Sequence, residues 1–283
     1  MPRNTDALWS RLLGIIAALS AALLLLMVGF LLKEAAPALQ NGGWLAFVHD
    51  DGWFPLENLF GLMPMVWASL LIALAAMLLA APLGLANALF LRFYAPASWL
   101  KAYRLLLSLL AGMPSVVYGL WGLTVMVPII AAYHQPGTSL LAAALVLALM
   151  IVPTVALTSA AALEAVPRSL YTGAVALGMR RPAVLLGVMI PAARHGIVAG
   201  MMLAMARALG ETMVVLMVAG NVVQVPSSVF DPLRALTANI ALEMGYATDI
   251  HRAGLFASAL LLTFLVLLLA GFAARQGSTH ALA

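Results

Sequence analysis

Two ionisable residues of opposite charge stand inside a long apolar stretch, residues 196–222. Arg207 and Glu211 are four positions apart, so a continuous helix would place both side chains on one face. A charged side chain near the middle of a bilayer costs about 2.5 to 3.5 kcal/mol on insertion scales, and such residues normally face a protein interior or a wet pathway. The pair therefore indicates the handling of a polar or charged solute.

The same pair has a purely structural interpretation. Arg207 and Glu211 could neutralise each other as an ion pair that only fixes helix packing. In a membrane, removing both charges would cost less than pairing them, which favours the functional interpretation. Small residues recur at every fourth position beside the pair and would let another helix approach closely: Gly196, Gly200, Ala204, Ala208 and Thr212.

The composition places the chain in a membrane. Of its 283 residues, 65% are hydrophobic and 8% are charged, and the apolar runs are too long for the core helices of a soluble protein. Because there is no cysteine, disulfides and thiolate metal sites are excluded. The basic residues lie mainly beside apolar segments, where they set topology rather than bind nucleic acid. We predict one all-α integral membrane domain, residues 1–283, without a separate soluble domain or a cleavable signal sequence.

Six apolar segments predict six transmembrane helices. Their approximate ranges are 12–32, 62–91, 105–132, 139–163, 196–222 and 253–274. Arginine and lysine concentrate in the N-terminal segment, the second and fourth connections and the C-terminal segment, which the positive-inside rule assigns to the cytoplasm. The loop 35–60 combines acidic and aromatic residues, and we expect it to lie on the outer surface as an aromatic anchor or as the contact for an outer partner.

The third predicted span contains the irregular run GMPSVVYG, residues 112–119. Pro114 removes a backbone donor and the flanking glycines permit close approach, so a kink is predicted here. Ser115 and Tyr118, which follow Pro114, are candidates for lining a substrate pathway. The alternative is a kink that serves helix packing alone.

The fourth connection, about residues 164–195, is too polar to span and carries a recognisable spacing. Thr172-Gly173-Ala174 is followed after three residues by Gly178, and nine residues further by Val188-Met189-Ile190-Pro191. This resembles the signature loop of ABC importer permeases, EAA, three residues, Gly, nine residues, Ile, any, Leu, Pro. In that family the loop forms two short helices with Gly at the turn, and they sit in a cleft of the ATP-hydrolysing subunit. Thr172 replaces the family's Glu and Gly173 its first Ala, so a contact made by that Glu is not carried over.

The residues of this loop also support a helical hairpin by themselves. Gly178 can adopt the positive φ of a turn, and Pro182 suits an early helical position. Without the resemblance, the loop would be interpreted as an amphipathic basic surface segment. With it, the residues expected to couple to the ATPase are Thr172, Gly173, Ala174, Gly178, Arg180, Arg181 and Pro191.

Two further runs resemble the membrane subunits of phosphate-specific ABC importers. They are GMPSVVYGLWG at 112–122 and RALGETMVVLMVAGN at 207–221, and the ALGETM form is closer to PstC-type than to PstA-type subunits. The resemblance implies the type I ABC importer permease fold in a bacterial cytoplasmic membrane, and the positive-inside rule places both termini in the cytoplasm. The resemblance also implies three partners: a second, PstA-like permease, a cytoplasmic ATPase dimer and a periplasmic phosphate-binding protein.

A guanidinium offers a planar fork of donors that suits inorganic phosphate. Arg207 is the predicted transient partner of the anion, and Glu211 would hold Arg207 when phosphate is absent. The full set of predicted pathway residues is Arg207, Glu211, Thr212, Ser115 and Tyr118.

No catalytic residue, metal ligand or cofactor is predicted in the chain. The two lysines, Lys33 and Lys101, lie outside any P-loop pattern, so ATP and Mg²⁺ are expected on the partner ATPase. The alternatives to a phosphate permease are an ABC permease for another oxyanion or solute, and a secondary transporter or channel. A membrane-embedded enzyme is a further alternative, but no nucleophile-base constellation recommends it.

Overall fold

The computed structural model describes residues 3–50 and 52–278, so residues 1–2, 51 and 279–283 of the predicted domain lie outside the described part. Most of the described residues are helical. The long helices are α1 (Arg3–His49), α2 (Met63–Leu89), α3 (Ala97–Gly112), α6 (Leu140–Ala165), α9 (Ile190–Leu209) and α12 (Asp249–Ser278). The shorter α-helices are α4 (Ser115–Trp121), α5 (Val127–Ala131), α7 (Arg168–Ala176), α8 (Arg181–Val184), α10 (Met213–Val218) and α11 (Leu236–Glu243). The π-helical turns are η2 (Phe90–Tyr94), η3 (Gly122–Met126) and η4 (Leu185–Met189), and a small hairpin consists of β1 (Trp53–Phe54), the 3₁₀ turn η1 (Pro55–Glu57) and β2 (Leu59–Phe60).

Five continuous helical segments are long and apolar enough to cross a membrane. They cover residues 8–40, 63–94, 140–165, 181–209 and 249–276. A sixth span is formed if α3 and the segment Ser115–Ala131, which meet at an angle of 87°, are counted together. The prediction of an all-α, multi-pass membrane protein is confirmed.

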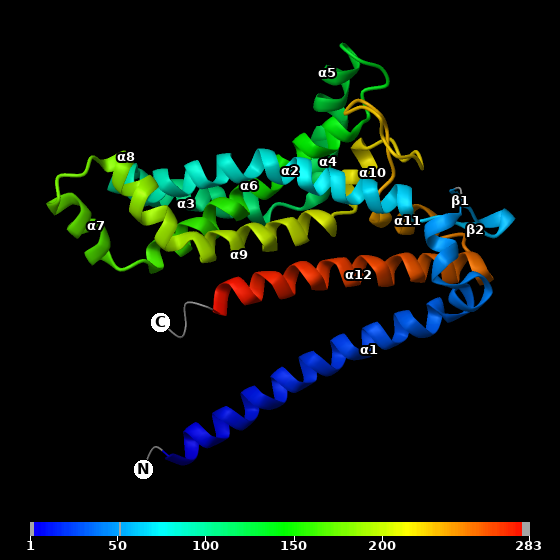
Figure 1. Cartoon of the computed structure of the whole chain (residues 1–283), viewed down its shortest axis with the longest axis horizontal. Helices are drawn as coiled ribbons and strands as arrows, with labels where there is room; N and C mark the ends of the chain where they lie inside the picture. Colours follow the sequence, from blue (N-terminus) through cyan, green and yellow to red (C-terminus); the bar gives the residue numbers. More distant parts are fainter. Residues whose placement is uncertain (1–2, 51, 279–283) are drawn as a thin grey trace.

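The long helices run roughly along the long axis of the molecule, so its two ends differ in content (Figure 1). The first turns of α1 and the last turns of α12 lie at the same end as α7 and α8. The hairpin of β1 and β2 lies with α11 at the opposite end. We call the end with α7 and α8 the hairpin end, because these two helices form a helical hairpin. We call the end with β1, β2 and α11 the β1–α11 end.

One predicted break is present, and two helices have other bounds than those predicted. The first helix does not stop at Lys33 but continues to His49, with Pro37 inside it. The third span breaks at Met113 and Pro114, where the kink was predicted, because Pro114 has no N–H to continue the helix. The fifth span begins at Arg181 and ends at Leu209, so residues 196–222 do not form one helix.

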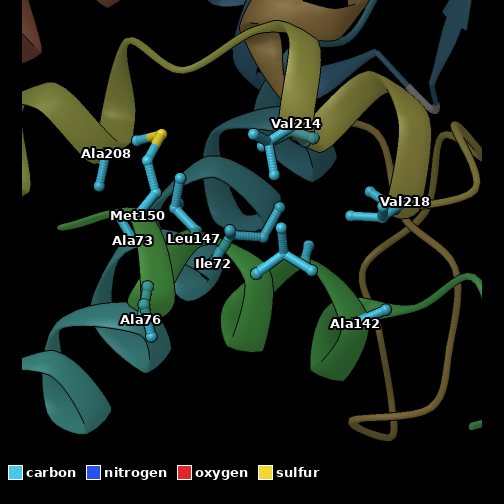
Figure 2. Packing of buried hydrophobic residues seen from close by; sticks show 14 of the residues in the cluster. Ile72, Ala73, Ala76, Ala142, Leu147, Met150, Ala208, Val214 and Val218 are labelled. Atoms are coloured by element: carbon cyan, nitrogen blue, oxygen red, sulfur yellow. The ribbon is translucent and has the colours of Figure 1, made fainter. Parts of the chain in front are cut away.

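The core is built where α2 packs against α6. Figure 2 shows Ile72, Ala73 and Ala76 of α2 facing Leu147 and Met150 of α6, and all five side chains are at most 2% exposed. The many alanines along α2 let the two helices approach closely, as small residues do in membrane bundles. Residues of α9 and α10 cover the same cluster, among them Ala208 and Val214. The core therefore positions α9 and α10, the two helices that flank the site described below.

We expect Gly84→Ala to destabilise this α2–α6 contact. A Cβ at Gly84 would lie 2.6 Å from Val155 Cγ1 and 2.7 Å from Val155 Cβ, so α6 would have to shift. Such overpacking costs about 1 to 3 kcal/mol, which thermal unfolding in mild detergent would show as a lower midpoint. Gly271→Ala on α12 is the matched control, because no atom lies within 4 Å of its added Cβ. Equal midpoints for the two variants would contradict the close packing.

Candidate solute pathway and coupling hairpin

Arg207 lies in the last turn of α9 and links three segments. Its Nη1 donates to Thr154 Oγ1 of α6 at 3.4 Å, and its Nη2 donates to the carbonyl oxygen of Ala111, near the end of α3, at 3.2 Å. The side chain is exposed on the surface of the single chain. Its guanidinium is thus fixed by two neutral acceptors and keeps an open side.

The predicted ion pair between Arg207 and Glu211 is wrong. The helix ends at Leu209, and Glu211 stands in the break before α10. Its Oε1 accepts hydrogen bonds from the backbone N–H groups of Met213 at 3.1 Å and Val214 at 3.3 Å. A carboxylate is favoured at a helix N-terminus, where donors lack partners in the helix. Glu211 therefore caps α10, and Arg207 has no carboxylate partner among the residues described.

Two helix breaks meet beside this guanidinium. One separates α3 from α4 at residues 113–114, and the other separates α9 from α10 at residues 210–212. The bond from Arg207 to Ala111 joins them, and Gly119 of α4 lies against α10, where an added Cβ would come within 3.3 Å of Val214 Cα. Non-helical backbone at membrane depth is tolerated only inside protein or along a water-filled cavity. The arrangement places an exposed cation beside two breaks in the helical backbone, which suits transient binding of an anion.

The other predicted pathway residues lie around the same breaks but differ in access. Ser115 begins α4 and Thr212 precedes α10, and both are half-buried. Tyr118 is buried, and its hydroxyl donates to the carbonyl oxygen of Leu110 at 2.9 Å. That bond satisfies a carbonyl at the end of α3, so Tyr118 holds the bend between α3 and α4 and does not face an opening.

The predicted hairpin turn is present. Gly178 has a φ of +78°, between α7 and α8, and Pro182 occupies an early position of α8. The Leu177 N–H donates to the carbonyl oxygen of Gly173, and the Gly178 N–H donates to that of Val175. These two hydrogen bonds close the end of α7. The second arm differs from the predicted short helix, since it continues through η4 into α9 and so reaches Arg207.

The predicted coupling residues are mostly exposed along this hairpin. Thr172, Gly173, Gly178, Arg180 and Arg181 are open to contact. Ala174, within α7, is buried, and Pro191, the second residue of α9, is exposed. The hydroxyl of Thr172, which stands where the family has Glu, donates back to the carbonyl oxygens of Arg168 and Ser169, each at 3.2 Å.

A polar cluster at the β1–α11 end was missed by the sequence analysis. Glu243 is buried and accepts from three side chains: Trp53 Nε1 at 2.6 Å, Arg234 Nη1 at 2.7 Å and His251 Nε2 at 2.9 Å. Arg234 also donates to Asn239 Oδ1 at 3.0 Å. The cluster ties β1, α11 and α12 together, and its only sequence signal was the occurrence of charged residues in the connections 35–60 and 225–252.

Glu243→Gln should destabilise this cluster by about 2 kcal/mol, because Arg234 and Trp53 lose an ionised acceptor in a buried place. The measurement is the thermal unfolding midpoint of the purified chain in detergent. Glu57→Gln makes a fair comparison, since Glu57 is exposed at the same β1–α11 end; its midpoint is expected to stay unchanged. A Glu243→Gln midpoint equal to that of the unsubstituted chain would show that the cluster contributes nothing to stability.

Two groups at the β1–α11 end have shifted pKa values. Hydrogen bonds from the Ser227 hydroxyl and from the backbone N–H groups of Ser228 and Ser227 hold the pKa of Asp231 below its usual value. The stability that these bonds add is therefore present above the ordinary Asp pKa and is lost as pH falls through the lowered one. Burial, and then the charge of Glu243, raise the pKa of Tyr246. In the described part of the chain, no group of three or more His, Asp or Glu side chains could hold a metal ion.

The broken spans and the helical hairpin form the fold of type I ABC importer permeases. A solved chain with the same fold belongs to a bacterial ABC transporter involved in the import of the acidic polysaccharide alginate; it has a TM-score of 0.63, 14% identity and 97% coverage of both chains. Residues 80–276 match the family described as binding-protein-dependent transport system inner membrane component. The chain belongs to this family.

Named relatives in this family are more similar in sequence. The phosphate transport system permease protein PstC of Xylella fastidiosa is 36% identical over 281 residues, covering 92% of this chain and 83% of the relative. The probable ABC transporter permease protein YqgH of Bacillus subtilis is 41% identical over 208 residues, covering 72% of this chain and 67% of the relative.

Proposed function

We propose that this chain is the PstC-type permease subunit of an ATP-driven importer that moves inorganic phosphate across the bacterial cytoplasmic membrane. The observation that carries the proposal is the open guanidinium of Arg207 at the meeting point of two broken spans. The name of the Xylella fastidiosa relative, which covers most of the chain, supports phosphate as the solute.

Phosphate must lose part of its hydration at mid-membrane, so the pathway has to supply replacement donors. Arg207 offers a planar fork of N–H groups, and charge-assisted bonds of this type are stronger than neutral ones. Because Glu211 caps α10 instead of pairing with Arg207, no carboxylate has to be displaced before the anion binds. The role first predicted for Glu211, as the resting partner of Arg207, is replaced by a role in holding the break open.

The exposed face around Arg207 is expected to be covered by a second permease of PstA type. On α4, Val116, Val117 and Leu120 present an apolar surface next to the break, and a second subunit would bury it and close the pathway. The anion would then pass between the two subunits by alternating access.

The two ends of the molecule suit two further partners. The hairpin end, with Arg180, Arg181 and Gly178, would contact a cytoplasmic ATPase dimer that binds ATP and Mg²⁺, so that this chain itself needs no cofactor. Its basic character supports a cytoplasmic location for this end and for both termini. The β1–α11 end would then face a periplasmic phosphate-binding protein.

Reconstitution of the complete transporter in proteoliposomes tests this function. With ATP inside the vesicles and the loaded binding protein outside, radiolabelled phosphate should accumulate, and unlabelled phosphate should compete where sulfate and molybdate do not. Competition by sulfate but not by phosphate would assign the chain to another oxyanion. Uptake without the ATPase subunit would make the chain a secondary transporter or channel.

A further inference from the structure

A separate cavity lies at the hairpin end, away from Arg207. It has a volume of about 240 Å³ and is bounded by η2, which follows α2, by the start of α7 and by η4. Arg92 and Arg168 supply its charge, and Phe93, Tyr171 and Met189 supply its apolar wall. The cavity thus combines two cations with an apolar surface.

Neither arginine of this cavity has a carboxylate partner. The ion pairs formed by described residues are Arg104 with Glu164, and Glu243 with Arg234 and His251. The Nε of Arg92 is buried and has no hydrogen-bond partner. Its guanidinium carbon lies 5.6 Å from the centre of the Phe93 ring, a contact that leaves the donors free. A buried charged donor without a protein acceptor is unfavourable, and an anionic acceptor group would satisfy it.

The cavity wall is partly apolar, and an aromatic stack joins two of its elements. Phe93 and Tyr171 stack with ring centres 5.6 Å apart and planes 19° apart, which joins η2 to α7. Met189 of η4 is only 2% exposed and fixes the third side. An anion that fits must therefore carry an acceptor group for two guanidinium forks, and its remainder can contact aromatic and aliphatic carbon.

The position of the cavity matches the depth of lipid headgroups. Tyr94, two residues after Arg92, and Trp99, at the start of α3, are 48% and 70% exposed at this end. Exposed Tyr and Trp at the end of a membrane helix mark the interface layer. Basic pockets between helices at this depth are suited to anionic headgroups.

We propose that Arg92 and Arg168 bind a phosphate group in this cavity, presented either by an anionic phospholipid headgroup or by free inorganic phosphate. Arg92 follows α2, and Arg168 begins α7, so a bound phosphate group joins the membrane core to the base of the coupling hairpin. This site is independent of the solute that the transporter carries, because it lies at the opposite end of α9 from Arg207.

The test uses the full chain in a detergent that contains no phosphate. Short-chain phosphatidylglycerol is titrated in one arm and inorganic phosphate in the other, with bound ligand measured by native mass spectrometry and by calorimetry. The variants are Arg92→Gln with Arg168→Gln, the charge-keeping pair Arg92→Lys with Arg168→Lys, and Lys101→Gln as the matched control. Lys101 is an exposed cation of α3 at the same end that does not line the cavity. Circular dichroism checks that each variant is folded.

Removal of both arginines should weaken binding by about tenfold or more, the lysine pair should bind with intermediate affinity, and Lys101→Gln should bind normally. If the glutamine variant loses binding of phosphatidylglycerol alone, the site is assigned to a lipid headgroup. If it loses binding of inorganic phosphate alone, the site is assigned to the free ion. Equal binding by the glutamine pair and the unsubstituted chain would overturn the proposal. If neither ligand binds and the glutamine pair instead loses the ATPase subunit, the cavity is a protein contact, which also overturns it.

Discussion

Arg207→Gln is expected to lower phosphate uptake by about 100-fold or more while the transporter still assembles. The substitution keeps two polar groups near Thr154 and the Ala111 carbonyl but removes the charge and the planar fork. Loss of a charge-assisted, two-bond contact to the anion corresponds to about 3 kcal/mol, which is the origin of the 100-fold figure. Uptake is measured in proteoliposomes, and assembly is followed by gel filtration of the complete transporter.

Arg207→Lys separates charge from geometry in the same assay. Lysine keeps the positive charge as a point donor but cannot form the bidentate contact, so its uptake should fall between that of Arg and Gln. Lys101→Gln removes a cation far from the breaks and should transport normally. Normal uptake by Arg207→Gln would remove this residue from the pathway and leave the two helix breaks without their proposed role.

The hairpin and the third-span break could be predicted because each depends on a local property of one residue. Pro114 lacks an N–H group, and the turn at Gly178 needs a positive φ that glycine adopts without strain. Both features were visible in a window of a few residues. The number of apolar segments was equally local, whereas the extent of α1 beyond Lys33 was not.

The Arg207–Glu211 pair shows why spacing alone misled. Four residues of separation bring side chains together only if the helix continues, and here it stops at Leu209. Glu211 then finds donors at the start of the next helix, three residues ahead at Val214. Once a helix ends, a carboxylate just after it can cap the next helix instead of pairing with a cation of the previous turn.

The Glu243 cluster could not be predicted because it depends on the fold as a whole. Trp53 and Glu243 are 190 residues apart, and nothing near either residue specifies the other. The cluster is nevertheless connected to the pathway. Thr237, early in α11, donates to the backbone oxygen of Glu211 at 2.9 Å, and α11 ends at Glu243. One short helix thus joins the break beside Arg207 to the β1–α11 end.

Gly178→Val is expected to uncouple ATP hydrolysis from transport. A Cβ at this position meets no atom within 4 Å, so crowding is not the cause; the cause is the φ of +78°, which a β-branched residue adopts with difficulty. Strain of about 1 to 3 kcal/mol would open the turn and tilt α7 relative to the continuous helix that leads to Arg207. The expected result is at least about tenfold loss of phosphate uptake, together with loss of the ATPase stimulation that the loaded binding protein causes.

Two variants distinguish the backbone effect from a general loss of stability. Asparagine tolerates the left-handed region better than valine does, so Gly178→Asn should retain most of the coupling. Gly187→Ala adds a methyl group to the second arm, where the nearest atom is Met179 Cε at 4.0 Å, and should behave as the unsubstituted chain. If Gly178→Val kept full stimulation and uptake, the turn would be dispensable. The signal from the ATPase would then have to enter through α7 or the basic residues beside it.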